Sequence, residues 1–271
     1  MIKDTFFSMP RFVNLCCKDM VENWRSNVLR IALMYGVMVV VLLWGGYLEY
    51  RYKDTLVDDN NLWRLSLVLF MWCLWGFGCL SASFTMEKMK TKTSRLSVLM
   101  TPATPFEKYF SRWLIFTFVF LVVFLIAFRL ADYTRVLVYT LTYPNLEEIA
   151  ALSLSHFVGD NTGYYTLCRT ANEFVTVIAL YFFTQSCFVL GSSIWPRSAF
   201  LKTFVAGALI VTVYVLLVVS MFELFEKGNF PSWLTNELVF TLLSIACLVF
   251  TLFNWALAYF RFKESEIINR M

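Results

Sequence analysis

Long apolar stretches separated by polar segments set the pattern of this chain. A helix that crosses the roughly 30 Å hydrocarbon core of a bilayer needs about 20 mainly apolar residues. Six stretches reach that length, and the interiors of the first five are nearly free of charge: residues 28–48, 62–84, 113–130, 174–195, 204–225 and 234–260. The pattern therefore predicts an all-α integral membrane protein, with six transmembrane helices in a domain spanning residues 28–260.

The residues ahead of the first stretch show an amphipathic pattern. Pro10 suits a first helical position. Apolar residues recur here at four-residue steps, at Phe12, Cys16, Met20 and Trp24. Polar and basic residues lie between them. This spacing favours a helix over residues 9–27 that lies along the membrane interface. The alternative is a plain extension of the first transmembrane helix.

The segment between the second and third stretches, residues 85–112, is rich in basic residues. A short apolar pattern at Leu96, Leu99 and Met100 overlaps the basic run and predicts a helix of about three turns. A break at Thr101 and Pro102 follows this pattern.

A helix start signal comes next in the same segment. Thr104, Pro105 and Glu107 have the form of a capping box, with Thr before the helix, Pro at its first position and Glu at its third. The third long helix is therefore expected to begin about two turns before the membrane.

Charge sets the expected orientation. Sixteen of the 23 Lys and Arg residues fall on one side of the predicted membrane, in residues 1–30, 85–112, the loop before residue 204 and the tail 261–271. Short flanking segments rich in Lys and Arg stay in the cytoplasm. Both termini are therefore predicted to be cytoplasmic, and residues 131–172 form a long outer loop. No removable signal peptide is apparent at the N-terminus.

Composition excludes several other classes of protein. The chain is 59% hydrophobic and 15% charged, with a net charge of only +4. Soluble domains have about 25% charged residues, and disordered chains combine low hydrophobicity with high net charge. The seven cysteines form no CxxC pair, which argues against a disulfide framework. Nothing in this composition favours a nucleic-acid partner.

Catalytic and metal-binding patterns are absent from the sequence. The chain contains one histidine, His156, which is expected to be an exposed loop residue, and it has no HExxH motif. The P-loop pattern GxxxxGK[ST] is also absent. The sequence therefore predicts no enzyme, metal or cofactor in this chain. Energy for any uphill transport would come from a partner.

Three stretches carry a resemblance to a known family. They are LSASF at residues 80–84, LMTPATPFEKYFSRW at residues 99–113, and the Gln-Ser, Leu-Gly-Ser and Lys-Thr groups within residues 185–203. Together with the interfacial helix, the six spans and the basic inner loop, they resemble the permease subunits of bacterial ABC transporters of the type-2 exporter class. The resemblance covers nearly the whole chain.

The resemblance implies a half-transporter in the bacterial cytoplasmic (inner) membrane. Such a chain would pair with a second permease subunit, identical or different, and with two ATPase subunits that use the ATP. In that family the inner loop couples to the ATPase, which here would involve Glu87, Lys88, Lys90, Lys92, Arg95, Phe106, Glu107 and Lys108. The chain departs from the family in having its long outer loop between spans three and four.

Two other functions remain open at this point. A non-transporting anchor or sensor that acts through residues 131–172 would explain the same apolar stretches. An intramembrane enzyme has little support, because no paired acid and base or nucleophile was found. The transported substrate is not readable from the span residues.

Overall fold

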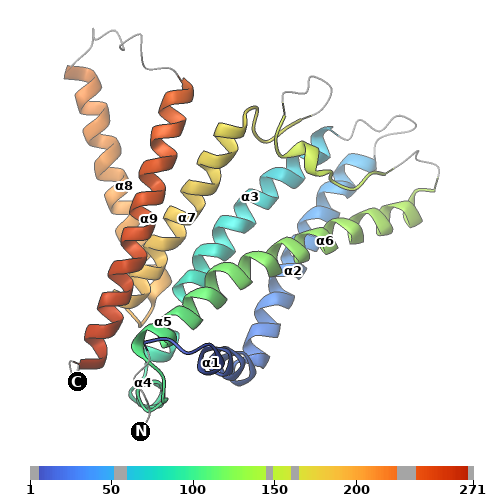
Figure 1. The fold of residues 1–271 in the computed structure, drawn as a ribbon. Helices are drawn as coiled ribbons and strands as arrows, with labels where there is room; N and C mark the ends of the chain where they lie inside the picture. Colours follow the sequence, from blue (N-terminus) through green and yellow to red (C-terminus); the bar gives the residue numbers. More distant parts are fainter. Residues whose placement is uncertain (1–5, 52–59, 145–148, 160–164, 225–235, 268–271) are drawn as a thin grey trace. The chain divides into compact units, whose positions relative to one another are not determined.

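The computed structural model describes residues 6–51, 60–144, 149–159, 165–224 and 236–267. The regular elements in these ranges are helical (Figure 1). The helices are α1 (Met9–Glu22), α2 (Trp24–Tyr50), α3 (Asn60–Ser83), α4 (Lys92–Leu99), α5 (Pro105–Leu114), α6 (Phe120–Thr142), α7 (Ala171–Ile194), α8 (Ala199–Leu224) and α9 (Asn236–Ile267), with the 3₁₀ turns η1 (Glu87–Met89) and η3 (Leu154–His156) and the π-helical turn η2 (Ile115–Val119).

Five helical segments are long and apolar enough to cross a membrane. They are Trp24–Tyr50, Asn61–Met89, Pro105–Thr142, Ala171–Ile194 and Glu237–Ser265. Several apolar helices of this length indicate a multi-pass membrane protein, as the sequence predicts.

The sixth predicted span, residues 204–225, falls on α8. Within α8, the segment Ala199–Val213 is an apolar helix shorter than a span. The sixth span therefore stays a prediction.

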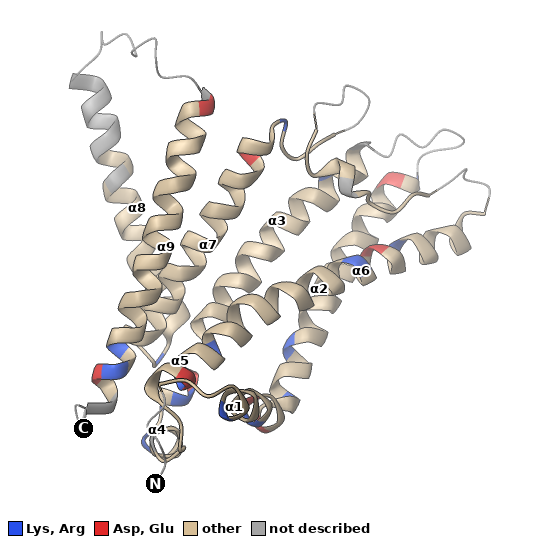
Figure 2. Cartoon of the chain, in the orientation of Figure 1, with Lys and Arg blue, Asp and Glu red and all other residues tan. Residues whose placement is uncertain are grey.

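Charged residues are absent from the middles of α7 and α9. Figure 2 shows α7 and α9 in tan, the colour of uncharged residues, along most of their length, with charged residues near their ends. In α7 the charge is Glu173, and in α9 it is Glu237 at one end and Arg261, Lys263, Glu264 and Glu266 near the other. Since a charge at the centre of a bilayer is costly, this distribution is typical of transmembrane helices.

Two helix boundaries differ from the sequence prediction. The first helix ends at Glu22 and not at residue 27, because Asn23 leaves the helical conformation and its side-chain amide donates to the Asp19 carbonyl. Trp24 therefore begins α2 and does not lie on α1. In addition, α6 continues to Thr142 through residues assigned above to the outer loop. The charged residues Asp132 and Arg135 in this continuation pair with each other, as described below.

The described residues fall into two compact units. Unit 1 comprises Met1–Phe12, Cys79–Phe116 and Val175–Met271, and unit 2 comprises Val13–Gly78 and Thr117–Phe174. Each unit has its own hydrophobic core.

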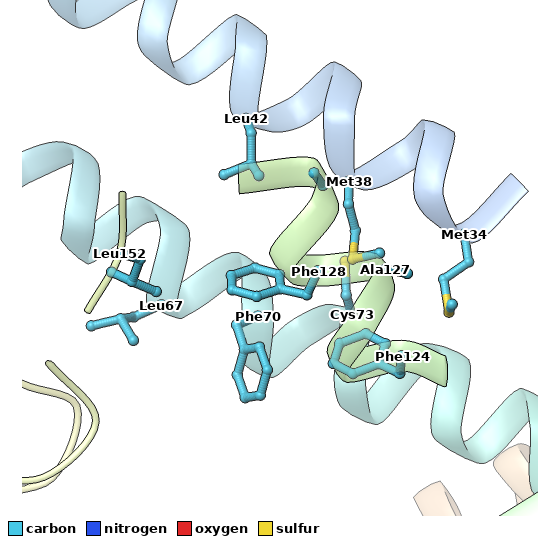
Figure 3. Packing of buried hydrophobic residues seen from close by; sticks show 11 residues of the cluster. Met34, Met38, Leu42, Leu67, Phe70, Cys73, Phe124, Ala127, Phe128 and Leu152 are labelled. Carbon is cyan, nitrogen blue, oxygen red and sulfur yellow. The ribbon is translucent and has the colours of Figure 1, made fainter. Parts of the chain in front are cut away.

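The core of unit 2 is formed by α2, α3 and α6. Figure 3 shows Met38 and Leu42 of α2, Phe70 of α3 and Phe124 of α6 among the packed side chains. In lipid, close packing takes over much of the role that water exclusion has in soluble proteins. Gly46 illustrates this, because a Cβ at that position would overlap the ring of Tyr139, whose hydroxyl donates to the Leu43 carbonyl.

The core of unit 1 joins the end of α3 to α4, α5, α7 and α9. Its buried members are Ala82, Met86, Met89, Val98, Tyr109, Val189, Ala258 and Phe262. The hydroxyl of Tyr109 donates to the Trp255 carbonyl over 2.9 Å, which fastens α5 to α9. The inner loop that the sequence singles out is therefore part of a packed unit.

Candidate functional site

The start of α5 forms the capping box that the sequence predicts. Thr104 Oγ1 accepts a hydrogen bond from the Glu107 backbone N–H (3.3 Å), and Glu107 Oε2 accepts one from the Thr104 backbone N–H (3.1 Å). Pro105 occupies the first helical turn. These contacts satisfy two of the donors that every helix N-terminus leaves without a partner.

Glu107 also binds the N-terminal segment of the chain. Its carboxylate accepts a bond from the Ser8 backbone N–H (2.7 Å) and two bonds from the Arg11 guanidinium, from Nε (2.7 Å) and from Nη2 (2.8 Å). The Glu107 side chain is fully buried, whereas that of Arg11 is 26% exposed. A two-point contact between a guanidinium and a carboxylate is among the strongest pairings that proteins use.

Aromatic rings extend this contact. Phe6 stacks on Phe106 with ring centroids 4.9 Å apart, and Phe12 packs on Phe110 at 5.3 Å. The Thr104 hydroxyl donates to the Phe6 carbonyl over 3.0 Å. We call this set, Phe6, Ser8, Arg11, Phe12, Thr104, Phe106, Glu107 and Phe110, the α1–α5 junction. It joins residues almost a hundred positions apart in sequence.

The basic run ahead of the junction folds around η1 and α4. Thr91 caps α4 by accepting a bond from the Ser94 N–H (3.4 Å). The Ser94 hydroxyl donates to the Lys88 carbonyl (2.7 Å), and Arg95 Nη2 donates to the Met89 carbonyl (3.1 Å). These bonds hold α4 against η1.

The outer face of α4 is exposed and of mixed chemistry. Lys92, Leu96 and Met100 recur at four-residue steps, so they lie on one side of the helix. Leu96 is 54% exposed and Met100 is 80% exposed. We call these three residues the α4 surface. The α4 surface thus combines one cation with two exposed apolar side chains.

The structure divides the predicted coupling residues into two groups. Glu107 and Lys108 are buried within unit 1, and Phe106 is half-buried in the α1–α5 junction. Glu87, Lys90 and Lys92 are exposed, and Lys88 and Arg95 are half-buried. Because it is buried, the Glu107 side chain holds α5 and the N-terminal segment together.

The predicted interfacial residues do not share one exposed face. Phe12 is buried, Cys16 is half-buried and Met20 is exposed, while Trp24 belongs to α2. Phe12 packs against Phe110 and so does not face the membrane interface. The four-residue spacing did not predict this contact.

Unit 2 contains a buried ion pair that sequence reasoning missed. Arg135 Nε donates to Asp132 Oδ1 (2.9 Å), and both side chains are at most 1% exposed. Arg135 also donates to the Ala150 carbonyl (2.9 Å) and the Tyr50 hydroxyl (3.2 Å), and Asp132 Oδ2 accepts from the Leu152 N–H (2.7 Å). The pair therefore fixes residues 150–152 to α6. Its signal in the sequence was the spacing of an acid and a base one helical turn apart.

His156 is buried, so the expectation of an exposed loop residue was wrong. It is 5% exposed, and its ring lies 4.5 Å from that of Trp63. The ring is covered because η3 folds back onto this part of unit 2.

Within the described ranges, no group of three His, Cys, Asp or Glu side chains is placed to hold a metal ion. The seven cysteines are free thiols.

Polar side chains also lie inside unit 1, on α7 and α9. The Asn254 amide donates to the Ser186 hydroxyl (3.0 Å) and contacts the Cys187 sulfur (3.5 Å). Gln185 is fully buried, and neither atom of its amide has a hydrogen-bond partner among the described residues. The Asn254 contacts join α9 to α7, as polar contacts between helices do in membrane proteins.

Comparisons with protein-family models, curated proteins and solved structures found no match for this chain.

Proposed function

We propose that this chain is the membrane-spanning permease subunit of an ATP-driven ABC exporter. In this proposal it lies in a bacterial cytoplasmic membrane with both termini inside, pairs with a second permease subunit and binds a separate ATPase that uses the ATP. The observation that carries the proposal is the α4 surface, held on a packed unit at the ends of apolar helices. Exposed apolar side chains on a polar segment call for a partner.

The α1–α5 junction supports a mechanical role for this region. Glu107 ties the N-terminal segment to the first turn of the long segment Pro105–Thr142. A force applied to α4 would reach α5 through unit 1, since Val98 of α4 and Tyr109 of α5 belong to the same core. A docked ATPase would thus move the inner end of a transmembrane helix.

The exposed residues of α1 support the interfacial part of the proposal. Met9, Val13 and Met20 are 61%, 47% and 44% exposed and fall on one side of the helix. An apolar stripe of this kind is stable at a membrane interface, where it is buried among lipid headgroups. In the proposal, α1 therefore lies along the inner surface of the membrane.

The test is affinity purification of the tagged chain from native membranes in a mild detergent, after crosslinking. The expected result is a stoichiometric partner that carries GxxxxGK[ST] and hydrolyses ATP. Leu96→Ala with Met100→Ala should reduce recovery of this partner at least tenfold. Leu242→Ala is the matched control, because Leu242 is as exposed as Leu96 (54%) but lies on an apolar span.

Two results would count against this account, the first against the proposal itself and the second against the role of the α4 surface. One is a purified chain without any ATP-hydrolysing partner, which would favour the non-transporting anchor or sensor. The other is equal partner recovery from the α4 variant and the Leu242→Ala control. That result would keep the ATPase as a partner but remove α4 from the interface.

A further inference from the structure

A stripe of exposed apolar side chains runs along α6. Its members recur at steps of three or four residues and therefore share one side of the helix: Val122, Ile126, Leu130, Tyr133, Leu137 and Leu141. Each of them is between 52% and 75% exposed. The first three belong to the third predicted span, and the last three to the residues that the sequence assigns to the outer loop. The stripe passes from one part to the other without a break.

The second half of the stripe does not fit a helix end that projects into water. At about 1.5 Å per residue, residues 131–142 would extend an upright helix by about 18 Å beyond the predicted span. Leu137 and Leu141 would then lie in water, although they are more exposed than the stripe residues within the span. Continuous apolar surface of this kind indicates a partner or a membrane.

Contacts with α2 place the same residues at membrane depth. The Tyr139 hydroxyl donates to the Leu43 carbonyl, and the Tyr139 ring fills the space beside Gly46. Leu43 and Gly46 lie within the first predicted span, residues 28–48, and α2 is long and apolar enough to cross a membrane. In Figure 1, α6 crosses α2 at a slant. Tyr139 and the neighbouring Leu137 therefore lie at the depth of a span.

The polar groups of this segment are suited to a lipid environment. Asp132 and Arg135 are buried and paired with each other. Three hydroxyls donate to carbonyls of the preceding turn over 2.7–2.8 Å, namely those of Thr134, Thr140 and Thr142. Tyr133 is the exposed polar member of the stripe, and tyrosine is enriched where acyl chains meet headgroups. Burial in lipid thus leaves neither the charges nor the threonine hydroxyls without a partner.

We propose that residues 131–142 of α6 lie obliquely within the membrane, with Tyr133, Leu137 and Leu141 against the acyl chains of lipids. A helix whose apolar surface is longer than the bilayer is thick keeps that surface in lipid by tilting. The partner of this surface is therefore the bilayer, and the ion pair of Asp132 and Arg135 lies at membrane depth. The name of the leaflet, the outer one, rests on the orientation in the proposed function; the placement in lipid does not.

The test is photo-crosslinking of the full chain in nanodiscs of phosphatidylcholine. Each variant carries one photoreactive benzoylphenylalanine, and mass spectrometry of the intact chain measures the lipid adduct after irradiation. Leu137 is the test position, Ile126 in the same stripe is the positive control, and the exposed Ser155 beyond α6 is the control outside the stripe. The adduct at Leu137 should be as abundant as that at Ile126 and at least tenfold more abundant than that at Ser155.

A set of ordinary variants tests the same placement through stability. Leu137→Asp places a charge among acyl chains and should lower the melting temperature in nanodiscs by several degrees. Leu137→Ala removes the same side-chain contacts without adding a charge and should have little effect, because Leu137 is 61% exposed. Ser155→Asp adds the same charge outside the stripe and should leave the melting temperature unchanged.

Three results overturn the proposal. The first is a lipid adduct at Leu137 that is as rare as that at Ser155, and the second is a melting temperature of Leu137→Asp equal to that of Leu137→Ala. The third is an adduct with a second protein chain in place of lipid, which would assign the surface to a protein partner. None of these measurements involves ATP hydrolysis, so a failed search for an ATPase would contradict the proposed function and leave this placement standing.

Discussion

Each unit buries one carboxylate that is paired with an arginine, and the two pairs are built differently. Glu107 in unit 1 binds Arg11, which lies 96 positions earlier in the chain and is 26% exposed. Asp132 in unit 2 binds Arg135, which lies three positions later on the same helix and is fully buried. Both carboxylates also accept hydrogen bonds from backbone N–H groups. Each one therefore holds a backbone segment in place as well as pairing with an arginine.

The difference lies in what happens when each pair separates. An arginine that already touches water can be hydrated after its partner leaves, so opening the Glu107 pair leaves only one buried charge, the carboxylate, without its partner. A fully buried arginine that has lost its partner keeps a charge that neither water nor a carboxylate compensates. Breaking such a pair lowers the free energy of unfolding by about 3–5 kcal/mol. The α1–α5 junction is therefore suited to a contact that opens and closes, and the pair on α6 to a permanent one.

The largest expected effect is that of Arg135→Gln. The change leaves the Asp132 carboxylate buried without its cation and removes the bonds to Tyr50 and Ala150. We expect a loss of about 3–5 kcal/mol in the free energy of unfolding, measured by SDS titration in mixed micelles. The double variant Asp132→Asn with Arg135→Gln is the control, since it removes both charges and should cost less than the single change. A cost below 1 kcal/mol for Arg135→Gln would contradict the proposed permanence of this pair.

Glu107→Gln should have the second largest effect. The amide keeps one acceptor oxygen for donors from Ser8, Thr104 and Arg11, so at least one backbone donor loses its partner. Hydrogen bonds to a charged group contribute about 1.5–3 kcal/mol, which is the expected loss. Faster hydrogen exchange at residues 8–12 would show that the N-terminal segment has been released.

The same variant tests coupling. If the junction transmits motion to the proposed ATPase partner, Glu107→Gln should lower the stimulation of ATP hydrolysis several-fold while that partner stays bound. Unchanged stimulation together with faster exchange would show that the junction is structural only. A stability loss larger than that of Arg135→Gln would overturn the comparison itself.

The sequence predicts local signals better than distant contacts. The capping box was confirmed because Thr104, Pro105 and Glu107 are adjacent and act through their own backbone. Five of the predicted spans also lie on helices that are long and apolar enough to cross a membrane, since the length and composition of an apolar stretch suffice for that prediction. By contrast, the further role of Glu107 depends on Ser8 and Arg11, and no spacing rule reaches across about a hundred residues.

The errors share a physical cause. Charge was taken as a sign of a loop, so the helix that carries Asp132 and Arg135 was predicted to end before them. Two opposite charges one turn apart satisfy each other, and α6 continues to Thr142. His156 was placed in water for the same reason, although Trp63 covers it.

Thr104→Ala should have a smaller effect than either carboxylate change. It removes the side-chain acceptor for the Glu107 N–H and the donor to the Phe6 carbonyl, but leaves the ion pair with Arg11. The loss of a helix N-cap costs about 1 kcal/mol. Thr104→Ser, which keeps the hydroxyl, is the control in the same SDS titration. Equal costs for the two variants would show that the lost methyl group, and not the cap, carries the effect.

Lys18→Gln should have the smallest effect on the free energy of unfolding. It gives the cost of losing one exposed charge, against which the other variants are compared. Lys18 lies 3.7 Å from Glu22 on α1, and the two side chains are 46% and 44% exposed. Exposed pairs at this spacing contribute about 0.3–0.5 kcal/mol, and the order of Lys before Glu is the weaker one on a helix. We expect a change of at most about 0.3 kcal/mol that disappears in high salt. If Lys18→Gln lowered stability as much as Glu107→Gln, the effect of the junction would reduce to the net charge of α1, and the buried carboxylate would lose its special role.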